Sequence, residues 1–346
     1  MLAVNSTKKI LKTVCLAVGL VTLTLPVLAQ KVSKVGTTAA DFLLIPVGTR
    51  ASAMGGAVTA TIDGPTSMYW NPAGLASLKD NEVSAEAANW PAGITHSFVG
   101  VAMPVGNGAA GINVTALTMT SMEVTTYDYP EGTGQTFAPY SISVGATFAQ
   151  YLLSQFAIGG NVKFIQESIM DTKAMGVAFD IGTMYTTPWY GIRFGVDVSN
   201  VGPKMRINGD GLITPVDLDP NGQGNYKGDA NLRTDPFALP LQLRVGLAWD
   251  AVKTKLYRVT VDVDGNSPTN NDQSVSVGGE ISFLNDQFVI RGGVPELGLR
   301  DRIIMYAGGL GISHRIAGSL NLSVGYSYTQ YKYLNSVNRI SLKIGF

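Results

Sequence analysis

Few residues in this sequence have the types and spacing that chemistry requires. Gly106, Gly108 and Gly111 match the G-x-G-x-x-G pattern of dinucleotide sites. Such a site needs a helix that opens directly after the glycines, because the helix dipole holds the pyrophosphate. Here an alternating apolar segment follows, which predicts a strand, so we interpret the glycines as a hairpin.

A second pattern resembles the start of a calcium loop. Asp217, Asp219 and Asn221 are followed by Gly222, which is the order of oxygen ligands and glycine in such loops. The expected glutamate is replaced by Gly228, and no helical pattern flanks the segment. We therefore interpret 217–222 as a solvated turn, with calcium binding as the alternative.

Groups that could catalyse a reaction are sparse. The chain has two histidines, His96 and His314, and one cysteine, Cys15. It contains no G-x-S-x-G, H-E-x-x-H or P-loop pattern, so we expect no enzyme, no metal and no cofactor. Its 25 basic and 25 acidic residues balance, which argues against a nucleic-acid-binding protein.

The N-terminal residues predict export. Lys8, Lys9 and Lys12 precede an apolar run over 14–28, which ends at Ala29. A basic start, an apolar stretch and a small-residue end are typical of a secretory signal peptide, which we place at 1–29.

The low charge of the chain predicts a membrane protein. Only 14% of the residues are charged, against about 25% in soluble domains. No later segment has the 18 or more apolar residues that a transmembrane helix needs. A closed β-barrel is the other structure that can cross a bilayer.

Alternation of apolar and polar residues supports the barrel. Leu241, Leu243, Val245, Leu247 and Trp249, for example, alternate with polar or small residues. Period two places each set on one face of a strand. We predict about fourteen antiparallel strands, an even number as in bacterial barrels. They span 82–90, 94–103, 109–119, 140–151, 155–167, 174–187, 190–199, 241–251, 254–264, 273–284, 287–294, 303–315, 318–331 and 335–346.

The charges follow the polar faces of these strands, which indicates lipid outside and a polar interior. A soluble β-sandwich would have fewer strands and a more charged exterior. Most charges in the predicted strands fall on the polar stripe, namely Lys163, Asp180, Arg193, Asp197, Arg244, Arg258, Asp262, Glu280, Arg291, Arg339 and Lys343.

Connection lengths set the orientation. Short turns alternate with long connections at 120–139, 200–240, 265–272 and 295–302. Short periplasmic turns and long external loops are typical of outer-membrane barrels, and Phe346 closes the last apolar stripe. We therefore expect a multi-pass barrel over 82–346 in the outer membrane of a Gram-negative bacterium, with membrane lipid around it.

Residues 30–81 lack this alternation and are rich in small residues. Because they precede the first strand and contain large apolar side chains, we expect them to fold back into the barrel as a hatch. Arg50 would fix the hatch by pairing with one of four lumen carboxylates, since its planar fork suits a carboxylate. The candidates are Asp180, Asp197, Asp262 and Glu280.

Three blocks in this region, at 34–43, 47–56 and 69–75, resemble the PorV/PorQ family of FadL-like outer-membrane barrels. Asn71, Pro72 and Ala73, followed by Gly74, match a motif in the hatch of the fatty-acid transporter group. The resemblance implies a 14-stranded barrel with an internal hatch. It also implies a part in type IX secretion, in which such proteins bind secreted cargo and carry it to surface attachment.

Two functions follow from these observations. The first is secretion or surface attachment, with the translocon and cargo C-terminal domains bound through external loops, chiefly 200–240. The alternative is uptake of hydrophobic small molecules, which needs an apolar pocket beside the hatch. The polar lumen favours the first function, although a pocket near Met119 or Met205 would favour the second.

Overall fold

A computed structural model of the chain describes residues 35–217, 227–316 and 320–346. The expected signal peptide at 1–29 and residues 218–222 of the calcium-like segment lie outside the described residues. No helix in the described part of the chain is long and apolar enough to cross a membrane.

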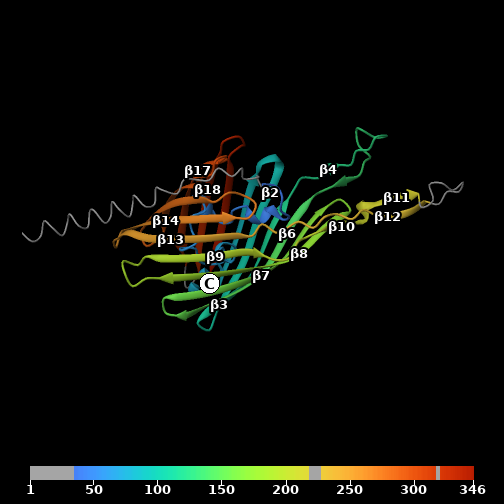
Figure 1. Ribbon diagram of the computed structural model, residues 1–346. Coiled ribbons are helices and arrows are strands. Elements are labelled where there is room, and N and C mark those ends of the chain that lie inside the picture. Colours follow the sequence, from blue (N-terminus) through green and yellow to red (C-terminus); the bar gives the residue numbers. More distant parts are fainter. Residues whose placement is uncertain (1–34, 218–226, 317–319) are drawn as a thin grey trace, which may run out of the picture. The chain divides into compact units, whose positions relative to one another are not determined.

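Long antiparallel strands make up most of the described chain (Figure 1). Each predicted strand coincides with an observed one, and the ends differ by a few residues. The strands are β1 Glu82–Trp90, β2 Ile94–Val105, β3 Gly108–Thr118, β6 Tyr140–Leu153, β7 Phe156–Ile169, β8 Thr172–Thr186, β9 Arg193–Val201, β13 Gln242–Lys253, β14 Tyr257–Pro268, β15 Ser274–Phe283, β16 Phe288–Leu297, β17 Ile304–Arg315, β18 Asn321–Tyr331 and β19 Val337–Gly345.

These strands close into a barrel. Each pairs with its neighbour in the chain order above, and β1 pairs with β19 to join the two ends of the sheet. Phe346 continues this closure, because its backbone exchanges two hydrogen bonds with Asn81. Among the described residues, fourteen strands therefore form the barrel, as predicted, and only the short β10 (Ile207–Gly209) pairs beside it at the end of β8.

The alternation predicted from the sequence sets the two faces of the wall. On β13, Leu243, Val245 and Leu247 are exposed on the outer face, whereas Arg244 and Ala248 are buried on the inner one. The charged residues assigned to polar faces are all buried or half-buried. An apolar outer surface on a closed barrel matches a bilayer core, so the protein is an outer-membrane β-barrel.

The two ends of the barrel differ. At the turn end, where β1 begins and β19 finishes, the connections are short. At the opposite end, which we call the loop end, the long connections carry two hairpins (Figure 1). These are β4–β5 (Met122–Glu123 with Thr136–Phe137) and β11–β12 (Ile213–Asp217 with Lys227–Asn231).

Four loop predictions need correction. The segments expected as loops at 120–139 and 200–240 contain the two hairpins, whose ladders are too short to show alternation clearly. The loops expected at 265–272 and 295–302 begin late, because β14 runs to Pro268 and β16 to Leu297. Polar and glycine residues break the apolar pattern there, yet the backbone ladder continues.

Residues 35–81, which we call the N-terminal segment, fold into short helices. They are η1 Asp41–Leu44, α2 Thr49–Ala53, α3 Ser67–Trp70 and η2 Pro72–Ser77. Further short helices lie at η3 Pro91–Gly93 and η4 Asp210–Leu212 in the connections. Most of the N-terminal segment is buried, and residues such as Val47, Met54 and Leu75 have no exposed surface.

Inward-facing glycines make room for the N-terminal segment. A Cβ at Gly293 would lie 2.2 Å from the carbonyl carbon of Met54, and one at Gly195 would lie 2.2 Å from the oxygen of Thr59. Real Cβ atoms do not approach backbone so closely, so glycine is required. Glycines in eight further strands also face the segment, namely Gly100, Gly111, Gly159, Gly182, Gly246, Gly278, Gly309 and Gly325.

Two adjacent glycines on β16 test this fit. Gly293→Ala should lower the free energy of unfolding by about 1–3 kcal/mol, because the methyl group collides with the backbone at Met54. Gly292→Ala is the matched control, since its Cβ would meet nothing nearer than the Ala307 oxygen at 4.0 Å. Heat-modifiable gel mobility at increasing urea measures both. Equal midpoints for the two variants would contradict the close approach.

Candidate functional site

Arg50 joins the N-terminal segment to the barrel wall. Its Nε donates to Glu280 Oε2 at 3.0 Å, and its Nη1 donates to the Thr61 carbonyl at 2.8 Å. Glu280 also binds the Arg291 Nε at 2.6 Å and lies 3.8 Å from Arg258. One carboxylate thus bridges a cation of the segment and two cations of the wall.

The other three proposed partners of Arg50 bind different groups. Asp262 accepts a hydrogen bond from the Thr61 hydroxyl at 2.9 Å. Asp180 is paired with Lys163, and Asp197 with Arg244, each at 2.9 Å. Of the four carboxylates, the structure therefore brings Glu280 into direct contact with Arg50.

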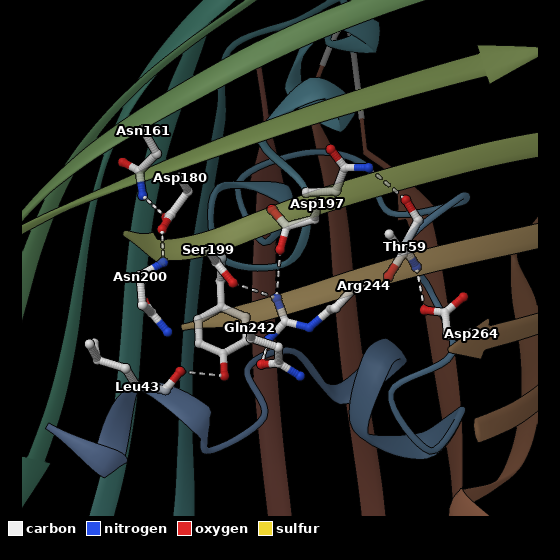
Figure 2. Close-up of polar contacts among 12 residues, drawn as sticks. Leu43, Thr59, Asn161, Asp180, Asp197, Ser199, Asn200, Gln242, Arg244 and Asp264 are labelled. Carbon is white, nitrogen blue, oxygen red and sulfur yellow. Dashed lines mark hydrogen bonds and ion pairs between the residues drawn. The ribbon is translucent and has the colours of Figure 1, made fainter. Parts of the chain in front are cut away.

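Further carboxylates of the wall accept backbone N–H groups of the N-terminal segment. Asp264 Oδ2 accepts from both Val58 N and Thr59 N at 2.9 Å, and Figure 2 shows the contact with Thr59. Glu86 accepts from Gly48 N at 2.7 Å, and Glu167 from Ala40 N at 3.0 Å. Charged acceptors at buried N–H groups make strong hydrogen bonds. These three carboxylates were not predicted from the sequence as contacts of the segment, although each lies on a polar stripe.

Arg244 is buried inside the barrel and contacts both the wall and the N-terminal segment. It binds Asp197 and Ser199 on β9 and Gln242 on its own strand (Figure 2). Its guanidinium carbon also lies 4.9 Å from the ring centroid of Trp70. A paired guanidinium stacked on an aromatic ring keeps both groups in one position.

The Asn71–Gly74 motif lies in a buried turn between α3 and η2. The Asn71 side chain accepts from Ala73 N at 3.1 Å, and donates to the Thr59 and Thr183 carbonyls at 2.8 and 3.1 Å. Pro72 begins η2, where its missing N–H costs nothing. A Cβ at Gly74 would lie 2.3 Å from the Ile62 oxygen. The motif thus ties two turns of the segment to β8.

A cavity of about 230 Å³ lies on the loop-end side of the N-terminal segment. Its apolar lining includes Leu44, Trp70, Trp90, Leu299, Ile304 and Tyr331. Its polar lining includes Asp41, Gln242, Arg244, Asn270, Glu296 and Arg339. The cavity is not at Met205, where we placed a possible pocket. Met205 is buried against Phe42 and Leu43 of the segment, which occupy that space.

The described residues form no metal-binding cluster at this cavity. Within the described ranges, no three His, Cys, Asp or Glu side chains could share a metal ion. His96 is buried on β2, with Nδ1 3.4 Å from an Arg339 nitrogen. Gly106 has a φ of +60°, and the hairpin between β2 and β3 accounts for the G-x-G-x-x-G match.

The fold is similar to that of several solved outer-membrane barrels. The toluene transporter TbuX of Ralstonia pickettii has a TM-score of 0.54 and 15% identity, over 88% of this chain and 100% of that one. The toluene transporter TodX of Pseudomonas putida has a TM-score of 0.57 and 12% identity, over 86% and 96%. A FadL homologue of Pseudomonas aeruginosa has a TM-score of 0.50 and 11% identity, over 87% and 98%.

Sequence comparisons add no family assignment. No family model matches the chain, and no curated protein matches it in sequence. At identities this low, the structural likeness establishes the fold, which is that of the FadL-type barrels. The finer resemblance to PorV/PorQ and the role in type IX secretion receive no support from these comparisons.

Removing the Arg50 contact tests whether it holds the segment in place. Arg50→Ala should give frequent openings in planar bilayers, because the segment loses its ion pair to Glu280 while Glu280 keeps Arg291. Arg193→Ala is the control, since Arg193 forms its ion pair with Asp250 of the barrel wall, at 2.6 Å. Conductance that is unchanged in Arg50→Ala would contradict the role of this pair.

Proposed function

We propose that this barrel is a channel for the uptake of small hydrophobic molecules across the outer membrane. In this function the cavity receives the molecule from the loop end. The N-terminal segment acts as the hatch that closes the route beneath it. The observation that carries the proposal is the cavity with aromatic walls directly above that segment.

The chemistry of the cavity supports uptake. Binding sites for small molecules are concave, mainly apolar and lined by a few fixed polar groups. Trp90 and Tyr331 pack edge to face, with ring centroids 5.9 Å apart, and Ile304 packs against the same cluster. This wall offers an apolar surface to an aromatic or aliphatic molecule. The transporters that share the fold are named for toluene and monoaromatic hydrocarbons.

The polar interior is compatible with this function. The lumen charges that favoured a structural barrel in the sequence analysis are largely paired with each other or with the N-terminal segment. They hold the segment, while the cavity above it keeps an apolar wall. Passage requires the segment to shift, and its contacts through Arg50, Asp264 and Glu86 are separate polar bonds that can exchange with water.

Secretion remains a prediction without a supporting observation. The external connection 200–240, which we expected to bind a translocon or cargo, includes the β11–β12 hairpin. No feature of the described part of that hairpin favours a particular partner, so we do not extend the proposal to it.

Filling the cavity tests the proposal. Ala307 on β17 is 5% exposed and lines the cavity, so Ala307→Trp should occupy it and block uptake. Ile312→Trp is the control, because Ile312 lies on the outer face of the same strand. The measurement is entry of phenylpropanol into vesicles with a lipopolysaccharide outer leaflet. Entry no faster with wild-type protein than without it would refute uptake.

A further inference from the structure

An irregularity in β16 places a glutamate at the cavity. Val275 pairs with Leu297 and Val277 with Val294, so Pro295 and Glu296 together lie opposite Ser276. A bulge of this kind redirects side chains that regular alternation would send outward. Pro295 and Glu296 therefore both line the cavity, although they are consecutive.

The backbone at Glu296 is strained to make this possible. Its φ is +56°, in the left-handed region that non-glycine residues rarely adopt. Such strain persists where the surrounding structure fixes it, and it gathers at binding sites. Glycine adopts this backbone conformation without strain. The chain has glutamate here instead, and the difference between the two residues is a side chain that ends in a carboxylate.

Other acceptors share the cavity with Glu296. Asp41 and Asp272 line it, and Asn270 donates its Nδ2 to Asp41 Oδ1 at 3.0 Å. Asn270 is 7% exposed, and its Oδ1 is buried without a hydrogen-bond partner among the described atoms. A buried acceptor of this kind is satisfied by a donor group, such as the N–H of a bound molecule.

The two cations of the cavity are already balanced. Arg244 is paired with Asp197 at 2.9 Å, and Arg339 with Glu86 at 2.8 Å. The positive charges of both arginines are therefore neutralised by carboxylates that do not themselves line the cavity. Asp41 and Glu296 add carboxylates to the lining itself, whereas Arg302, the cation that acts on Glu296, lies outside the lining. The faces of Trp90 and Tyr331 add attraction for a cation.

We propose that the cavity selects amphipathic organic cations, whose ammonium group faces Glu296 and Asn270 while the apolar body lies against Trp90 and Tyr331. This inference rests on the cavity being the binding site of the proposed channel. It narrows the substrate class from hydrophobic molecules in general to primary amines with an aromatic or aliphatic body.

Three probes with the same apolar body separate the effect of charge on binding from the effect of shape. Phenylpropylammonium, phenylpropanol and phenylbutyrate carry positive, zero and negative charge on the same phenylpropyl body. Binding to the purified full-length protein is measured by calorimetry. The cation should bind about tenfold more tightly than the alcohol, and the carboxylate more weakly than either.

Variants at Glu296 identify the source of the preference. Glu296→Gln should remove the preference for the cation and leave the affinity for phenylpropanol unchanged. Glu296→Gly should also remove the preference for the cation. Because glycine relieves the strained backbone, this variant tests the inference even if the glutamine variant folds poorly. Glu123→Gln, on the external β4–β5 hairpin, is the matched control and should retain the preference.

The outcomes separate this inference from the proposed function. Equal binding of all three probes, tighter binding of the carboxylate, or a preference that survives in both Glu296 variants would overturn the charge selection and leave uptake in place. If no probe binds and phenylpropanol entry is also not accelerated, the channel proposal fails together with it.

Discussion

The architecture depends on how closely the N-terminal segment approaches the inner wall. Ten of the fourteen strands present a glycine to it, and at Gly159, Gly195 and Gly293 an added Cβ would lie within 2.5 Å of segment backbone. The remaining strands contact it through side chains, such as Ser341 with Thr49 and Asp264 with Val58. Without side chains in the way, backbone packs on backbone, which leaves little space between segment and wall.

This close packing buries backbone N–H groups of the segment, and side chains of the wall provide acceptors for them. Short helices and turns leave backbone N–H groups without partners, and buried N–H groups are costly when unpaired. Carboxylates of the wall accept several of them, and Arg50 balances part of the resulting negative charge. The lumen is therefore polar because it holds a polypeptide. The same charges are therefore consistent with the proposed channel for hydrophobic molecules.

The cavity is what remains where the segment does not fill the barrel. It lies toward the loop end, between the upper face of the segment and the ends of β13 to β19. The bulge at Pro295–Glu296 gives the cavity an acidic side chain, and the Trp90–Tyr331 pair gives it an apolar wall. A site with both qualities suits a molecule that has a charged end and an apolar body.

The sequence alone determined the barrel. Alternation as clear as that of β13 follows from a wall that has lipid on one side, so strand number, facing and location could be predicted. Arg50 and the Asn71 motif were also visible as residue types. Only the tertiary structure decided that Glu280, among four acidic candidates, contacts Arg50, because those carboxylates share one pattern and differ in height and angle around the barrel. It also placed Glu296 in the cavity, since a bulge breaks the period on which facing predictions depend.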